Sequence, residues 1–344
     1  MKTTKTNKAN LNNSRIAKTT RNLFGILVLI ALTFTSCKDP EDQQEESKPN
    51  GAALTALFEN NRTDALQSFT VDIDGGAVVT GDQGTKVTFP ANSVGLNGTP
   101  VTGNITVELI EVYSKGAMLL QNMPTSGIKS DGTEEALISA GEFFLNAKQG
   151  TTQLEILIPV QIQSRGIVPA TWEPMQVFKA GDDLQDNDLW EEVEGADGGN
   201  QNAEGGEGQG PDGEYVMFSI FDTSSFGWAN LDRWAGYTGA KTQIYVDVPN
   251  DFDGDNCEVY LSYDGEPTAL ARMDIYNSTT ELFTEHYGQI PVGQDVHIIL
   301  VAEIAGELHY TIQGTTVVDN HTEVMAAPQP TTQAALETLI NALP

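Results

Sequence analysis

The sequence predicts an all-β chain of two antiparallel β-sandwich domains, joined by an acidic, glycine-rich loop and followed by a short C-terminal helix. Apolar and polar residues alternate with period two through much of residues 68–180 and 215–320. Asp-Gly and Asn-Gly pairs separate these runs, and such pairs supply the positive φ angles that hairpin turns require. Helical patterns do not intervene between the runs, which argues against the βαβ units of a parallel sheet.

The chain begins with a basic segment, an apolar run and a cysteine. Residues 1–22 carry 6 Lys or Arg and no acid, and the apolar run from Leu23 to Thr35 leads through Ser36 to Cys37. A basic head, a short apolar core and small residues at its end are the three parts of a secretory signal. The core is shorter than the roughly 20 apolar residues that a spanning helix needs. A short anchor helix that is never cleaved is the alternative.

The tail Phe-Thr-Ser-Cys resembles the lipobox of bacterial lipoproteins, with Phe34 in place of the usual Leu. The resemblance implies that residues 1–36 are removed as a signal peptide and that Cys37 carries a diacylglycerol thioether, which anchors the chain in a membrane. Residues 37–50 are rich in acids and predict a flexible tether. Their opening also resembles the surface-export signal of lipoproteins from the Bacteroidota, with a plain periplasmic spacer as the alternative. We expect a lipid-anchored outer-membrane protein at the cell surface.

The charge of the remaining chain excludes one class of partner. Beyond the leader, 12 bases face 48 acids, for a net charge near −36. Nucleic acid and anionic lipid headgroups are polyanions, so we expect neither as a partner. Since Cys37 would be acylated, Cys257 has no cysteine to pair with, and its place in an alternating run predicts a buried core residue.

Two segments, 51–67 and 321–344, have apolar residues at helical spacing. The residues that set this spacing are Leu54, Leu57, Phe58, Leu336, Leu339, Ile340 and Leu343. The first segment predicts a short helix before the first sandwich. The second predicts a linker and a terminal amphipathic helix, which we expect to dock on its own chain, with a partner protein as the alternative.

Within residues 68–180, the Phe89-Pro90 turn and the following strand from Gly103 to Leu109 resemble the β-sandwich domain shared by ankyrins, netrin receptors and tight-junction scaffold proteins. The continuations MLLQNMPTSG and ISAGEFFLNAKQG resemble a group of uncharacterised surface lipoproteins from the Bacteroidota. The first resemblance implies a domain that binds partner proteins and is not an enzyme.

Residues 181–214 form the clearest boundary in the sequence. They contain 12 acids, 9 glycines and no base, with Trp190 as the one large apolar residue well inside. This composition predicts a disordered or loosely held loop.

The segment GWANLDRW, which begins at Gly227, resembles a signature of the same lipoprotein group. One interpretation is a polar-aromatic platform for a sugar, because pyranose rings stack on indoles and hydrogen-bond to carboxylates and guanidinium groups. The platform residues would be Trp228, Asn230, Asp232, Arg233 and Trp234. We favour the alternative, a structural corner in which Trp228 fills the core and Asp232 pairs with Arg233 or caps a turn.

Residues 215–320 predict a second, Ig-like sandwich. In one of its loops, Asp251, Asp253 and Asp255 place three carboxylates at alternate positions, as at the opening of a calcium loop. The glycine of this loop comes too early for an EF-hand and Ser262 stands where the final Glu belongs, so an ordinary acidic turn is the alternative. Calcium is the one cofactor that the sequence suggests.

The sequence contains no G-x-S-x-G, H-E-x-x-H or P-loop motif, and we expect no enzyme. The four histidines show no close pairing, so we expect no zinc site. We predict a non-catalytic binding or assembly module at the cell surface, whose partner is a protein. The alternatives are a glycan-binding lipoprotein that uses the Trp228 group and a calcium-stabilised adhesin.

Overall fold

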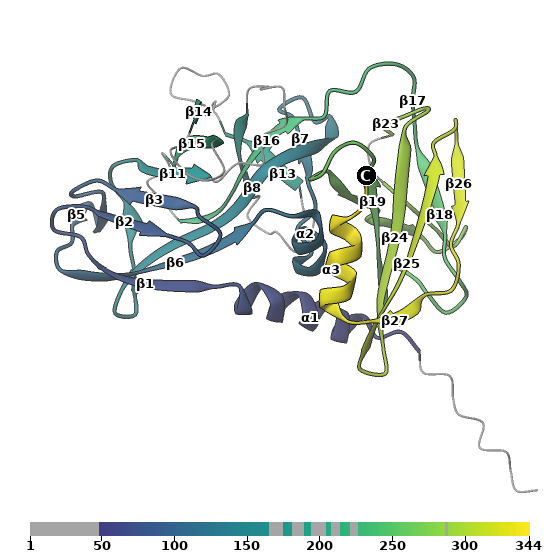
Figure 1. Cartoon of the computed structure of the whole chain (residues 1–344), viewed down its shortest axis with the longest axis horizontal. Coiled ribbons are helices and arrows are strands. Elements are labelled where there is room, and N and C mark those ends of the chain that lie inside the picture. The colour runs from purple at the N-terminus through teal and green to yellow at the C-terminus, as the bar shows by residue number, and fades with distance from the viewer. Residues whose placement is uncertain are drawn as a thin grey trace, which may run out of the picture. The chain divides into compact units, whose positions relative to one another are not determined.

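The computed structural model describes residues 48–164, 175–180, 189–193, 204–207, 214–220, 226–285 and 288–344. Strands predominate in these ranges, as Figure 1 shows. The helices within them are α1 Gly51–Asp64, α2 Lys115–Gln121 and α3 Gln333–Asn341. The predicted all-β class with a short C-terminal helix is confirmed.

The largest sheet has the strand order β1-β6-β8-β16-β12-β13-β7, with β9 beside β8. Its strands are β1 Gln67–Asp72, β6 Asn104–Val112, β7 Ser126–Ile128, β8 Glu134–Gln149, β9 Thr152–Gln153, β12 Gln176–Ala180, β13 Leu189–Glu192 and β16 Gly227–Trp234. Because β7 pairs with β8 as well as with β13, the sheet closes on itself at this end. Strands of the closed end contribute Leu137, Phe178 and Trp190 to one buried apolar cluster.

A second sheet packs against the first and has the order β14-β15-β11-β3-β2. Its strands are β2 Ala77–Thr80, β3 Lys86–Phe89, β11 Val160–Ser164, β14 Glu204–Glu207 and β15 Glu214–Ile220, and a small sheet beside it holds β4 Val94–Leu96, β5 Thr99–Pro100 and β10 Glu155–Ile156. Val87 and Phe89 of β3 share a core with Leu109 and Leu145 of the larger sheet. Alternate residues along each strand face this core, as the period of two requires.

The second β region is also two-layered. One layer has the order β20-β19-β24-β25-β27 and the other β21-β22-β18-β26, with the pair β17-β23 alongside. The strands are β17 Lys241–Thr242, β18 Ile244–Asp247, β19 Cys257–Tyr263, β20 Leu270–Arg272, β21 Ile275–Asn277, β22 Leu282–Thr284, β23 Ile290–Pro291, β24 Asp295–Ile304, β25 Glu307–Thr316, β26 His321–Val324 and β27 Gln329–Thr331. Cys257 lies buried in this core, as its alternating run predicted.

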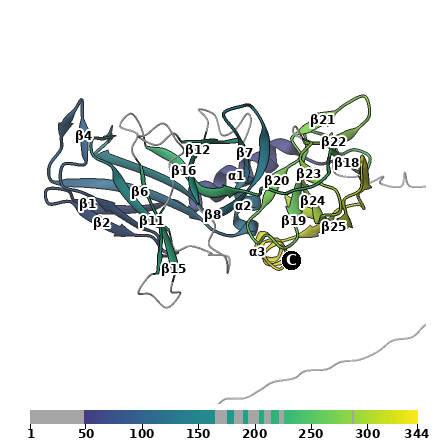
Figure 2. The same ribbon diagram turned by 90° about the horizontal axis from the view of Figure 1, so that it is seen from above.

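The three helices pack together between strands of the two β regions, as Figure 2 shows. Each helix buries two or more apolar side chains in one cluster with residues of β6, β19 and β24. The helical members are Leu54, Phe58, Met118, Leu119, Leu120, Leu336 and Ile340. The Asn50 side chain caps α1 by accepting from the Ala53 N–H. The terminal helix therefore docks on its own chain, as expected.

Pairing across the chain differs from expectation in two places. Strand β16 and all but the first residue of β15 fall inside residues 215–320, yet β15 pairs with β11, and β16 pairs with β8 and β12 of the first region. Strand β13 lies inside the segment 181–214 that composition predicted to be a loop, and Trp190 on it is buried. Alternation marks which face of a strand is apolar but does not select its partner, and one buried indole outweighs an acidic surrounding.

Candidate functional site

The polar-aromatic group of the GWANLDRW segment lies on β16, and the side chains of this strand are distributed over both faces of the sheet. Ala229 and Leu231 face the core of the first sandwich, while Trp228 and Trp234 pack on clusters at the other face of the sheet. Asn230 and Asp232 are fully buried. Since a sugar cannot reach buried groups, the five residues do not form one open platform.

Trp234 and Arg233 are held by neighbouring side chains. The Trp234 indole N–H donates to Glu192 Oε1 at 2.5 Å, and its ring meets Phe178 edge-on with centroids 5.3 Å apart. The Lys129 ammonium lies 4.7 Å from the centre of the Trp234 ring, a cation–π contact. Arg233 Nη2 lies 3.8 Å from Glu266 Oε2. The structural interpretation expected a corner in which Asp232 pairs with Arg233 or caps a turn, but the segment is a strand on which Asp232 accepts a hydrogen bond from Asn230. Trp228 packs against apolar clusters, as that interpretation expected.

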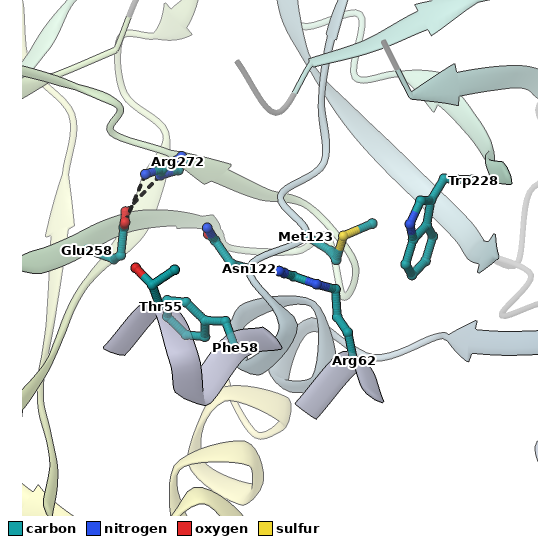
Figure 3. Close-up of a pocket in the computed structure, with 8 residues that line it drawn as sticks. All are labelled: Thr55, Phe58, Arg62, Asn122, Met123, Trp228, Glu258 and Arg272. Carbon is teal, nitrogen blue, oxygen red and sulfur yellow. Dashed lines mark hydrogen bonds and ion pairs between the residues drawn. The ribbon is translucent and has the colours of Figure 1, made fainter. Parts of the chain in front are cut away.

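Trp228 lines a pocket of about 230 Å³. Its wall is built from α1, the end of α2, β16, β19 and β20, as Figure 3 shows. The lining residues are Thr55, Phe58, Arg62, Asn122, Met123, Trp228, Glu258 and Arg272. The half-buried indole stands at one end, and the Glu258–Arg272 pair stands at the other. The pocket therefore combines an aromatic surface with a charged pair.

The charged end of the pocket is rigid. Arg272 donates two hydrogen bonds to the Glu258 carboxylate, from Nε at 2.7 Å and from Nη2 at 2.8 Å. Such a two-pronged pair adds geometric specificity to charge. A carboxylate has about four lone-pair positions, so Glu258 keeps accepting capacity beyond the two that Arg272 uses. The pair is therefore able to accept hydrogen bonds from hydroxyl groups of a ligand.

The neighbouring wall is fixed by contacts from α1 to α2. Arg62 Nη1 donates to the Gln121 carbonyl at 2.5 Å, and Asn61 donates to the Leu120 carbonyl at 2.7 Å. The Tyr260 hydroxyl donates to Asn122 Oδ1 at 2.6 Å. The first two bonds satisfy backbone carbonyls at the end of α2, which a short helix leaves without internal partners, and the third fixes the Asn122 side chain. The pocket is thus held open by fixed groups before any ligand arrives.

In the suggested calcium loop, the carboxylate of Asp253 bonds within the loop itself. Asp253 Oδ1 accepts from the Asp255 N–H at 3.0 Å, and the Asn256 side chain bonds to the Asp253 N–H and the Asp251 carbonyl. Lys48 Nζ lies 3.8 Å from Asp251. Throughout the described ranges, no group of three or more His, Cys, Asp or Glu is arranged to hold a metal ion. The loop has the bonding of an ordinary acidic turn.

The structure contains a pair of buried carboxylates that the sequence did not predict. Glu142 of β8 and Asp232 of β16 are both 0% exposed. Burial raises the pKa of both carboxyl groups well above their usual range, and the nearby Asp232 raises the pKa of Glu142 further. Glu142 stands inside the apolar run ISAGEFFLN, and this position could have indicated a buried carboxylate. A strand that is buried on both faces has no face in contact with solvent where a charge could lie.

Two of the described histidines lie beside an acid. His297 Nδ1 is 2.6 Å from Asp264 Oδ1, and His321 Nε2 is 3.0 Å from Glu323 Oε2. His309 Nδ1 lies 3.0 Å from the backbone carbonyl oxygen of Glu307. His286 lies outside the described residues, as does the lipidation residue Cys37.

Comparison of the chain with known family models, curated proteins and solved structures found no match. In the part of the chain that the structure describes, no helix has the length and apolar character to cross a membrane.

Proposed function

We propose that the chain is a lipid-anchored, non-catalytic binding module at the cell surface, and that it holds a saccharide unit in the Trp228 pocket. The observation that carries this proposal is the pairing of an indole with a fixed carboxylate–guanidinium pair across one small cavity. An indole face suits the apolar face of a sugar ring, and the charged pair suits its hydroxyl groups.

The size of the cavity supports one ring or one side-chain-sized group. Pockets for drug-sized ligands usually measure roughly 300–1,000 Å³, and this one is about 230 Å³. The fixed hydrogen bonds of Arg62 and Asn122 also support a preformed site, because little ordering cost then opposes binding. A protein partner that inserts one side chain would use the same features and is the competing ligand class.

The proposed location follows from the leader and from the resemblance of its end to a lipobox. Mass spectrometry of the mature N-terminus tests it directly. We expect a chain that begins at an acylated Cys37. An unmodified Cys37 in a chain that still begins at Met1 would contradict the membrane anchor, whatever the pocket binds.

The ligand class is tested on a glycan array with the full chain in detergent. We expect binding to a subset of saccharides that falls at least about tenfold in Trp228→Ala, the loss of roughly 1.4 kcal/mol of contact. Trp234→Phe is the matched control, since it alters an indole on the same strand outside the pocket.

Melting curves of both variants verify that they fold. Saccharide binding that Trp228→Ala leaves intact would place the ligand elsewhere. The absence of binding to every saccharide on the array would contradict the ligand class and favour a protein partner.

A further inference from the structure

The buried carboxylates Glu142 and Asp232 belong to one polar group on the face of the large sheet. Glu142 lies opposite Asn230 in the pairing of β8 with β16, and Asp232 lies opposite Ser139. The pairing shifts register between Asn230 and Asp232, which marks a β-bulge. Bulges re-aim side chains and often occur near functional sites. All four side chains of this group are buried.

Hydrogen bonds inside the group leave most of its charge without a partner. The Asn230 amide donates to Asp232 Oδ2 at 2.6 Å, and the Ser139 hydroxyl donates to Asn230 Oδ1 at 3.0 Å. Glu142 Oε1, Glu142 Oε2 and Asp232 Oδ1 are buried and accept no hydrogen bond from the described residues. Three carboxylate oxygens therefore face the interior without a donor.

No ion pair to either carboxylate occurs among the described residues. Arg233, the next residue after Asp232 in the chain, has its Nη2 3.8 Å from Glu266 Oε2. An uncompensated buried charge costs several kcal/mol, so a stable fold needs some positive charge at this place. The group must bind protons or a cation to be compatible with its burial.

We propose that Glu142 and Asp232, with the oxygens of Asn230 and Ser139 beside them, bind one divalent cation of the oxygen-preferring class, represented by Ca²⁺. Two carboxylates balance two positive charges, so the buried group becomes neutral. Ca²⁺ prefers carboxylate, amide and carbonyl oxygens and accepts a bidentate carboxylate, which the two free oxygens of Glu142 offer. The donor set holds two acids and two neutral groups, so it differs from the three-acid loop at residues 251–255.

The proposed site lies next to a contact between the two β regions. The Ser139 N–H donates to Thr268 Oγ1 at 3.1 Å, and the Thr268 hydroxyl donates to the Ser139 carbonyl at 2.7 Å. Thr268 lies just before β20 of the second region. A ligand that orders Ser139 and Asp232 therefore orders the strand segment that contacts the second region, and binding to the folded state alone raises stability.

Terbium luminescence tests the site, because Tb³⁺ substitutes for Ca²⁺ and is excited by a nearby indole. The full chain in detergent is stripped with a chelator and held in about 0.15 M NaCl to screen surface acids. We expect tryptophan-sensitised emission that Ca²⁺ displaces, because Trp228 and Trp234 flank the site on β16. Calorimetry with Ca²⁺ alone should report one matching site in the wild-type chain.

Three variants locate the signal. Glu142→Gln and Asp232→Asn keep the shape of each side chain and should abolish the emission. Asp251→Asn, in the acidic loop, should leave it unchanged. Near-ultraviolet circular dichroism verifies the fold of each variant, and the wild-type calorimetry does not depend on any variant.

Two outcomes would overturn the proposal. The first is a wild-type chain with neither emission nor calcium heat, in which case protons alone neutralise the two carboxyl groups. The second is a signal that survives both Glu142→Gln and Asp232→Asn, in which case the ion binds elsewhere on the acidic surface.

Discussion

Lys115, the first residue of α2, is 2% exposed, and its ammonium donates to the Ser262 hydroxyl at 2.7 Å. Burial lowers the pKa of Lys115 from 10.5 to about 8, against the smaller opposing influence of Asp264 and Glu266. This shift means that folding disfavours the charged form, relative to the neutral form, by about 3 kcal/mol. We therefore predict that Lys115→Met raises the free energy of unfolding near neutral pH.

The magnitude follows from the shift and from the bond that is lost. Removing the buried charge contributes about 3 kcal/mol, and losing the hydrogen bond to Ser262 costs about 1 kcal/mol. We expect a net gain of about 2 kcal/mol at about pH 7, measured by urea unfolding. A Met side chain has a similar length and leaves no polar atom to satisfy.

The pH dependence separates this cause from simple repacking. A lysine with a lowered folded pKa binds more protons when unfolded, so wild-type stability rises as the pH increases from about 8 towards 10.5. Between about pH 7 and about pH 9.5, the wild type should gain about 2 kcal/mol relative to Lys115→Met. Ser262→Ala is the control, since it keeps the lysine and should keep the pH dependence. Wild-type and Lys115→Met curves that run parallel over this range would refute the reasoning.

Two further substitutions test the packing of the fold. Glu111→Gln should lower the free energy of unfolding by about 2–3 kcal/mol. The two oxygens of the Glu111 carboxylate accept hydrogen bonds from the Gln83 and Thr85 N–H groups at 2.9 Å each. In glutamine an NH₂ group replaces one of these oxygens and would face an N–H group. Urea unfolding checks this, and an unchanged midpoint would contradict it. Gly116→Ala should cost about 1–3 kcal/mol and loosen α3, because the added methyl would lie 2.8 Å from the Glu337 carbonyl oxygen. Limited proteolysis checks the second change, since α3 should be cleaved faster than in the wild type.

The site illustrates how far local patterns reach. The sequence favoured a structural corner at GWANLDRW with Trp228 filling the core, whereas the segment is strand β16 and places Ala229 and Leu231 in the core of the first sandwich. Whether Trp228 lines a pocket or lies in a core depends on α1 and α2, which lie more than a hundred residues earlier in the chain. The register shift in β16 is equally invisible, because a bulge depends on the partner strand β8.

By itself, the sequence determined the strand content, the short helix after residue 50, the amphipathic C-terminal helix, the burial of Cys257 and the strong negative charge, because spacing and composition are local properties. Only the tertiary structure decided that β15 and β16 complete the sheets of the first region, that Trp190 is buried, and that Glu142 and Asp232 meet out of reach of water. The physical reason is that the burial of a residue depends on which elements pack on its side of the strand or helix. Those elements come from distant parts of the chain.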